Sequence, residues 1–338
     1  MPDLRRCARR ALLAAGANRA ASRAVADALL AAEADGVGSH GLSRLPDYVA
    51  QLRSGKVDGR ARPRVSRPAA GVIHVDARWG FAFPAVERGL DAALAVVSGQ
   101  GTAAVVVTNS HHLGAAGLSV ERIARAGCVG IALGNSPAAI APWGGRRPVF
   151  GTNVLAFGFP RDGAAPVVID LALSVAARGR LVMAAKRGDR IPDGWAFDED
   201  GTPTTDPARG LQGSLRPIGD HKGALLAMAV EIIAGALSGS RFGYEASSFY
   251  TPEGDPPGVG QFFLLLDPRA FGADTFCARV EQLLAHVLDD PGARLPGARR
   301  LHNRARAQRS GVSLPDGLWE RLQRLGAWPP PHRRPPGE

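Results

Sequence analysis

A strand, a glycine-bearing turn, a helix and a second strand follow one another between residues 103 and 133, and no other stretch constrains the fold as much. Residues 103–108 (AAVVVT) form a continuous apolar, β-branched run, which is typical of a strand buried on both faces. The polar turn 109–117 (NSHHLGAAG) leads into a helix that ends near Ala126, and residues 129–133 (VGIAL) form the next strand. This βαβ-like order predicts an α/β fold in which helices flank a buried sheet.

Apolar periodicity predicts the other elements of the chain. We expect helices at 4–15, 19–34, 43–53, 84–98, 175–186, 222–237 and 274–287. We expect further strands at 71–76, 155–159, 167–170 and 262–267. The long polar stretch 188–220 has the character of an active-site or partner-binding loop, and the Pro-rich tail 326–338 is predicted to be disordered.

Charge and cysteine content narrow the class of protein. The chain of 338 residues has a net charge of +10, but its 41 basic residues are interleaved with 31 acids. This pattern favours attraction of anionic cofactors and carboxylates over nucleic-acid binding. The three cysteines are far apart in sequence, no run of about 18 apolar residues occurs and the N-terminus lacks a signal-peptide pattern. We therefore expect a cytoplasmic protein without nucleic-acid or membrane partners.

Residues 39–44 (SHGLSR) form the first candidate site. His40 is suited to exchange a proton near neutral pH. Arg44 falls one turn along the following helix and is suited to a two-pronged bond with a carboxylate. The alternative is a helix cap at Ser39 or Ser43 beside an exposed histidine and a surface arginine.

The turn 109–117 is the second candidate site, because its backbone N–H groups and close-approach glycines suit a pyrophosphate. The GxGxxG fingerprint is absent, so an ordinary tight turn with a packing glycine is the alternative. The adjacent His111 and His112 lack the spacing of a zinc pair, and no metal is predicted. Asp170 ends a buried strand, where it either orients a catalytic partner or caps the helix expected near Ser174.

Two further segments could contact a ligand. His221 and Lys222 precede an apolar helix and could face phosphate or ribose, or they form an ordinary loop and cap. Thr152 lies in a Gly- and Pro-rich loop as either a substrate contact or part of a turn. The absence of a GxSxG elbow and of a P-loop disfavours a hydrolase or a kinase.

Taken together and in this order, the motifs resemble those of the malate/L-lactate dehydrogenase family, which is unrelated to the Rossmann-type lactate dehydrogenases. The motifs are 35–48 (DGVGSHGLSRLPDY), 109–117 (NSHHLGAAG), 135–137 (NSP), 141–145 (APWGG), 150–153 (FGTN), 169–170 (ID) and 221–223 (HKG). The resemblance covers about residues 5–325. It implies a large mixed sheet with flanking helices and a homodimer whose active site takes residues from both subunits. We divide the chain into an N-terminal helical segment with His40 (1–70), an α/β core (71–267), C-terminal helices (268–325) and the tail.

The resemblance also implies roles for individual residues. His40 is the proton donor, and Ser39 and Asp170 hold and polarise it. The implied substrate-binding residues are Arg44, Tyr48 and Thr152. The implied contacts of the cofactor, NADPH or NADH, are His112, Leu113, Gly114, Ala115, Ala116, Ser174, His221, Lys222 and Gly297. The family usually has an acidic residue where this chain has Ala298, a departure that bears on how the late loop grips the cofactor.

Within the family, four segments resemble the cyclic imine reductases: 54–59, 75–81, 194–198 and 245–249. This resemblance implies NADPH-dependent reduction of Δ1-piperideine-2-carboxylate or Δ1-pyrroline-2-carboxylate to L-pipecolate or L-proline, with hydride added to C2. The alternative is a malate/L-lactate-type 2-hydroxy acid dehydrogenase, which needs the same acid and the same arginine. A non-catalytic binding protein is a further alternative because of Ala298, and the joint presence of His40, Arg44 and Asp170 disfavours it.

Overall fold

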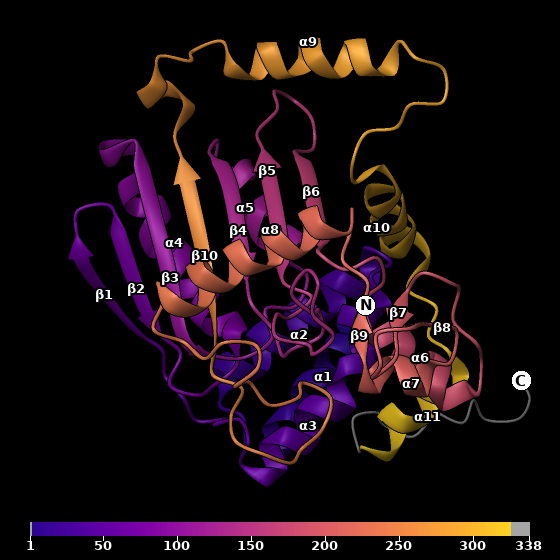
Figure 1. The fold of residues 1–338 in the computed structure, drawn as a ribbon. Helices are drawn as coiled ribbons and strands as arrows, with labels where there is room; N and C mark the ends of the chain where they lie inside the picture. The colour runs from indigo at the N-terminus through magenta and orange to yellow at the C-terminus, as the bar shows by residue number, and fades with distance from the viewer. Residues whose placement is uncertain (1, 326–338) are drawn as a thin grey trace, which may run out of the picture.

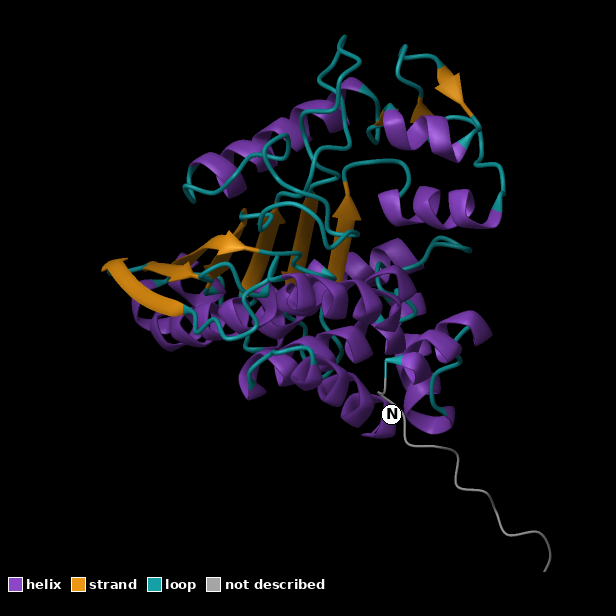
Figure 2. Cartoon of the chain, turned by 90° about the horizontal axis from the view of Figure 1, so that it is seen from below, coloured by secondary structure: helices purple, strands orange, loops and turns teal. Residues whose placement is uncertain are grey.

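The computed structural model describes residues 2–325 and is built around one large mixed sheet with helices on both faces (Figure 1). This is the α/β architecture that the sequence predicts. Figure 2 shows the layers edge-on, with most helices gathered on one side of the strands. The predicted tail, 326–338, lies outside the described residues.

The central sheet has seven strands, most of them antiparallel. In spatial order they are β1 (Arg64–Ala69), β2 (Val72–Asp76), β3 (Thr102–Ser110), β10 (Val259–Leu266), β4 (Val129–Gly134), β5 (Val154–Phe159) and β6 (Val167–Ala172). Only β2 and β3 pair in parallel among the described strands. The two strands of the predicted βαβ-like unit, β3 and β4, are separated by β10, which pairs antiparallel with both. The first strand, β1, is exposed and lacks an apolar run, so the sequence analysis missed it.

Helices cover the sheet because each presents an apolar stripe to it. On one face lie α4 (Ala82–Gln100) and α5 (Ala116–Arg125). On the other lies α8 (His221–Glu231), which continues as the π-helical turn η3 (Ile232–Ala236) (Figure 1). The core between the sheet and α4 and α5 includes Val105, Val107 and Phe263, none of which is exposed.

The N-terminal segment forms a second core of its own. It consists of α1 (Pro2–Ala14), α2 (Arg19–Ala34) and α3 (Leu45–Ser54). Two short 3-10 turns, η1 (Gly38–His40) and η2 (Leu42–Arg44), lie between α2 and α3. Asn18 caps α2 by accepting a hydrogen bond from the Ala21 N–H at 2.9 Å. The C-terminal helix α11 (Asp316–Arg324) packs here through Leu322, so the two ends of the described chain share one core.

The stretch 188–220 was predicted to be a long polar loop, and that prediction is wrong in part. It contains a three-stranded sheet of β7 (Ala196–Phe197), β8 (Pro203–Thr204) and β9 (Ser214–Leu215), with the short helix α7 (Pro207–Gln212). This small sheet packs with α6 (Arg178–Arg187) over a third apolar core. Two-residue strands give no periodicity that a sequence could reveal.

Two C-terminal helices complete the described chain. α9 (Phe276–Leu288) stands apart from the sheet (Figure 1), and among its side chains only Leu284 is buried. α10 (Ala298–Ser310) lies near β6 and the end of α2. No helix among residues 2–325 is both long enough and apolar enough to cross a membrane.

Candidate active site

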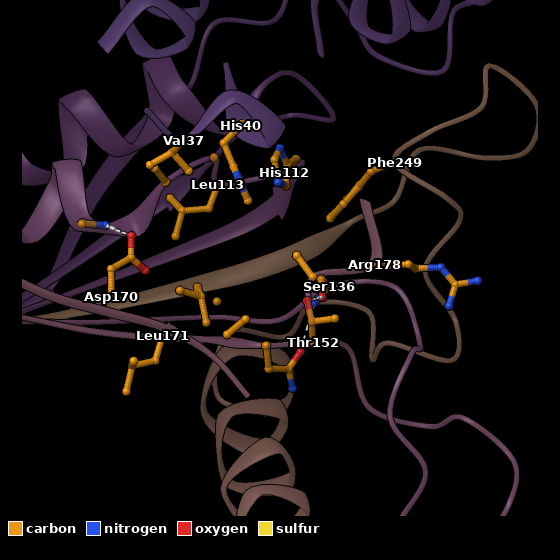
Figure 3. Close-up of a pocket in the computed structure, with 18 of the residues that line it drawn as sticks. Val37, His40, His112, Leu113, Ser136, Thr152, Asp170, Leu171, Arg178 and Phe249 are labelled. Carbon is orange, nitrogen blue, oxygen red and sulfur yellow. Dashed lines mark hydrogen bonds between the residues drawn. The ribbon is translucent and has the colours of Figure 1, made fainter. Parts of the chain in front are cut away.

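One cavity of about 790 Å³ lies where the η1 loop, the ends of β4 to β6, the 243–250 loop and the start of α10 meet. Its volume lies in the ordinary range for small-molecule sites. Figure 3 shows residues that line it. The predicted site residues that line the cavity are His40, His112, Leu113, Gly114, Ala115, Thr152, Asp170 and Gly297.

His40 is held at the cavity wall by its neighbour. The Ser39 hydroxyl lies 3.0 Å from His40 Nδ1, which leaves Nε2 as the ring nitrogen free for a ligand. The ring stacks on His112, with a centroid separation of 5.2 Å. Burial, and then the charge of Arg44, lower the pKa of His40 to about 4. His40 is therefore a neutral imidazole at pH 7, ready to accept a proton, and a bound anion beside it raises that pKa.

His112 is fixed from behind by Tyr48. The Tyr48 hydroxyl lies 2.7 Å from His112 Nδ1, and Tyr48 itself is completely buried. Burial is the main reason that the pKa of His112 lies well below its usual value, and the nearby His40 and Arg44 lower it further. Tyr48, predicted as a substrate contact, is not among the residues that line the cavity; in this structure it orients His112.

Arg44 lies behind the cavity wall. Its guanidinium donates to Asp47 at 3.0 Å and to the Phe249 carbonyl oxygen at 2.6 Å, and it stacks on the Tyr250 ring at 4.2 Å. Tyr250 lines the cavity, whereas Arg44 does not. Arg44 Nε is buried and has no hydrogen-bond partner, so one donor of this arginine is unsatisfied in the structure.

Asp170 lies in the cavity but holds a backbone group. Its Oδ2 accepts a hydrogen bond of 2.7 Å from the N–H of Gly117, at the start of α5, and the structure shows no hydrogen bond from Asp170 to His40 (Figure 3). A Cβ on Gly117 would lie 2.8 Å from the same carboxylate oxygen, so the close approach requires glycine. Asp170 thus caps a helix, although the sequence analysis pointed to the following one, which begins only at Arg178.

Four other predicted cofactor contacts do not line the cavity. Ala116 is buried at the first position of α5. Ser174 is buried, and its hydroxyl donates to the Ala176 carbonyl at 2.8 Å. His221 and Lys222 are exposed at the start of α8, where the His221 ring lies 5.4 Å from that of Trp143.

Sequence reasoning missed two arginines that line the cavity, Arg178 and Arg300. Arg178 is the first residue of α6 and donates to the carbonyls of Leu211 at 3.1 Å and Ala138 at 3.5 Å. No carboxylate among the described residues forms an ion pair with it, and burial lowers its pKa. Its only sequence signal was an arginine without a nearby acid in the segment 171–180 (LALSVAARGR).

Arg300 lines the cavity beside Gly297, on the side opposite Arg178. It donates to Glu121 Oε2 at 2.6 Å and lies 3.6 Å from Asp35. The N-terminus of α10 begins at Ala298, next to Gly297 in the cavity wall. Arg300 and the N-terminus of α10 therefore suit a phosphate-bearing cofactor on this side.

A family model described as malate/L-lactate dehydrogenase matches residues 1–323. The chain is 49% identical over 313 residues to a (2R)-3-sulfolactate dehydrogenase (NADP(+)) from Chromohalobacter salexigens, with 93% of each chain covered. It is 40% identical over 318 residues to a Δ1-pyrroline-2-carboxylate reductase from Ancylobacter novellus, again with 93% of each covered.

Solved structures of dehydrogenases and reductases also resemble this chain. Δ1-piperideine-2-carboxylate reductase from Pseudomonas syringae pv. tomato aligns with a TM-score of 0.90 and 37% identity, covering 96% of this chain and 98% of that one. Malate dehydrogenase from Entamoeba histolytica aligns with a TM-score of 0.89 and 27% identity, covering 96% of both. The resemblance drawn from the motifs is confirmed.

Proposed function

The chain belongs to the malate/L-lactate dehydrogenase family and is an NAD(P)-dependent oxidoreductase, and we propose that it transfers hydride between NADP(H) and C2 of a small 2-hydroxy or 2-imino acid. The observation that carries the proposal is His40, oriented by Ser39 and facing a cavity large enough for a cofactor and an acid. The nicotinamide accepts or supplies the hydride at C2. The work of the protein is to bind the acid, orient it and move one proton.

His40 moves that proton. In the oxidative direction, the neutral ring accepts the hydroxyl proton of the acid at Nε2 as hydride leaves C2. In the reductive direction, the bound carboxylate raises the pKa of His40, so that the imidazolium donates a proton to the oxygen or nitrogen. Asp170 supports this step indirectly, because it fixes the turn that carries His112, the ring stacked on His40.

Arg44 and Thr152 are proposed to hold the carboxylate at C1. The unsatisfied Nε of Arg44 is a donor without an acceptor, and the Tyr250 ring that lies on its guanidinium is part of the cavity wall. A shift of this ring brings the arginine to the substrate. Contacts from both Arg44 and Thr152 to the C1 carboxylate would turn C2 toward the nicotinamide.

The favoured substrate class is a 2-hydroxy acid with a second anionic group, such as a sulfonate or a second carboxylate. Arg178 supports it, because this half-buried arginine lines the cavity and bonds only carbonyl oxygens, so a ligand anion would be its ionic partner. The 49% identity to a sulfolactate dehydrogenase supports it as well. Cyclic imines are the second candidate, favoured by the four sequence segments and by relatives of 37–41% identity.

An absorbance assay at 340 nm decides between the two classes. Sulfopyruvate, oxaloacetate, pyruvate, Δ1-pyrroline-2-carboxylate and Δ1-piperideine-2-carboxylate are offered separately with NADPH and with NADH. We expect the highest kcat/KM with a doubly anionic 2-oxo acid and NADPH. A higher kcat/KM with the cyclic imines would identify them as the substrate class. No turnover with any of the five acids would refute the proposed function.

Arg178→Met tests whether Arg178 binds the second anionic group of the substrate. Loss of a hydrogen bond to a charged group costs about 1.5–3 kcal/mol, so kcat/KM with a doubly anionic substrate should fall roughly 10- to 100-fold. Pyruvate, which lacks the second group, should change less than about threefold. Arg180→Met is the matched control, because that exposed guanidinium lies over Trp195 and not at the cavity. Equal losses with both substrates would remove Arg178 from substrate selection.

We also propose that the enzyme is a cytoplasmic homodimer. Large apolar side chains are exposed along α8 and η3, namely Leu225, Leu226, Met228, Ile232 and Leu237. A contiguous exposed apolar face favours an interface. All three cysteines are free thiols, which suits a reducing compartment. Sedimentation equilibrium measures the mass directly, and a monomer at micromolar concentration would contradict the dimer.

A further inference from the structure

Glu231 is a buried acid that does not touch the cavity. It is the last residue of α8 and 4% exposed, and no lysine or arginine among the described residues forms an ion pair with it. Burial raises the pKa of its carboxyl. A buried carboxylate without a counter-ion is unfavourable unless several hydrogen-bond donors surround it.

Four N–H donors surround this carboxylate, and they come from three separate loops. Asn135 Nδ2 donates to Oε1 at 2.8 Å and Asn153 Nδ2 donates to Oε2 at 2.8 Å. The backbone N–H groups of Gly243 and Gly151 supply the other two bonds. The amide orientations are set independently, because Asn135 Oδ1 accepts from the Gly260 N–H at 2.9 Å and Asn153 Oδ1 accepts from the Ser136 N–H at 3.2 Å. Every contact on Glu231 is therefore a donor, and the two carboxylate oxygens supply the acceptors that these donors need.

The same three loops form the end of the cavity that contains Arg178. Ser136 and Thr152 follow and precede the two asparagines, and their hydroxyl oxygens are 3.4 Å apart. The third loop carries Phe249 and Tyr250. The loops approach one another closely, since a Cβ on Gly151 would lie 2.2 Å from the Ser136 carbonyl oxygen. No bond from Glu231 reaches the His112–Ala115 turn or Arg300.

We propose that Glu231 is the positioning residue of the substrate-binding end, where its carboxylate fixes the relative placement of the loops that carry Ser136, Thr152 and Phe249. It acts through Asn135, Asn153 and two backbone amides and does not touch the reacting atoms. The inference rests on the proposed function, because it assigns this end of the cavity to the acid and the other to the cofactor.

Glu231→Gln tests the proposal, because an amide in place of the carboxylate turns an NH2 group toward donors. With sulfopyruvate or oxaloacetate as the probe, we expect KM to rise at least about tenfold, while the NADPH dissociation constant from fluorescence titration changes less than twofold. Asp198→Asn is the matched control. This carboxylate is similarly buried, but it pairs with Arg209 at 2.6 Å and accepts from the backbone N–H groups of Asp200 and Thr202 in the small-sheet region. Its loss should leave KM unchanged.

Hydrogen exchange followed by mass spectrometry gives a readout that is independent of turnover. Peptides covering 134–138, 150–154 and 240–250 should exchange faster in Glu231→Gln, and the peptide covering 111–118 should not. Unchanged exchange in the three loops, or an unchanged KM in an active variant, overturns the proposal. If the wild type reduces none of the five acids, the proposed function fails, while the exchange result still decides whether Glu231 fixes the loops.

If Glu231→Gln does not fold, Asn153→Gly removes one donor from one loop. Asn153 has a φ of +32°, in the region that glycine adopts freely. The same changes in KM and exchange are expected, but smaller and centred on 150–154. A normal KM and normal exchange in this variant overturn the proposal as well.

Discussion

Glu121 and Glu231 are both 4% exposed and lie on helices that cover opposite faces of the sheet, yet the protein gives them different hydrogen-bond partners. Glu121 receives guanidinium groups from Arg125, Arg300 and Arg304, and these interactions lower its pKa to about 2 despite its burial. Glu231 receives only amide N–H groups, and burial raises its pKa. The ion pairs join helices to one another, whereas the amides define loop positions. The chain thus uses charge to attach helices near the proposed cofactor side and directed hydrogen bonds to place loops near the proposed substrate side.

His40→Ala should produce the largest change in kcat. This change differs in kind from the effects of substituting Glu121 or Glu231. Removal of the proton-transfer group lowers kcat by a factor of about 10²–10⁴. Binding of NADPH should change little, because the ring stacked on His40 is itself held by Tyr48. Stopped-flow turnover and fluorescence titration measure the two quantities. Wild-type turnover in this variant would remove His40 from the mechanism.

Glu121→Gln should act on the cofactor side. Arg300 and Arg304 would keep only Asp35 as an acid partner, and loss of one member of a buried ion pair costs about 3–5 kcal/mol. We expect a lower free energy of unfolding and an NADPH dissociation constant raised roughly tenfold, because Arg300 and Gly297 line the cavity. The acid KM, which Glu231→Gln should raise, should stay near the wild-type value.

Glu281→Gln is the control for that experiment. The Arg161–Glu281 pair joins α9 to the protein body at 2.6 Å, but its carboxylate side chain is 38% exposed. Exposed pairs contribute about 0–1 kcal/mol, so stability and NADPH binding should hardly change. If Glu121→Gln and Glu281→Gln change stability and NADPH binding equally, then burial does not distinguish these two ion pairs. Glu121 would then have no special role beside the cavity.

The sequence predicted the strands better than their order. The runs at 103–108, 129–133, 155–159 and 167–170 all form strands, because each is rich in the apolar and β-branched residues that strands favour. The insertion of β10 between β3 and β4 pairs residues more than 120 positions apart, and local periodicity carries no information about such pairing.

The same limit applies to the site. His40, His112 and Gly114 from the motifs line one cavity, since short segments carry their own turn chemistry. Arg44 lies behind the Tyr250 ring and Tyr48 lies behind His112, and these covering residues are far away in sequence. Glu231 was visible only as a single acid in the apolar run 224–237 (ALLAMAVEIIAGAL). Its role depends on loops nearly 100 residues away, which the sequence analysis did not connect to it.

The two carboxylates should also respond oppositely to acid, and this is the smallest of the expected effects. Glu121 has a folded-state pKa of about 2, below the ordinary 4.5. Its contribution to stability is therefore fully present above pH 4.5 and is lost as the pH falls toward 2. Glu231 has a raised folded-state pKa, so the folded protein binds this proton before the unfolded chain does. Between pH 4.5 and that raised value, its contribution makes the protein less stable as the pH rises.

Urea unfolding between pH 3.5 and 7 tests these signs. Relative to the wild type, Glu121→Gln should show a smaller loss of stability as the pH falls below 4.5, because the group responsible has been removed. Glu231→Gln should show a larger net loss on acidification from neutral pH, since the opposing contribution of Glu231 is gone. Parallel curves for the wild type and both variants would mean that neither carboxylate is linked to folding in this range. The ion-paired and amide-bound sites would then be electrostatically equivalent.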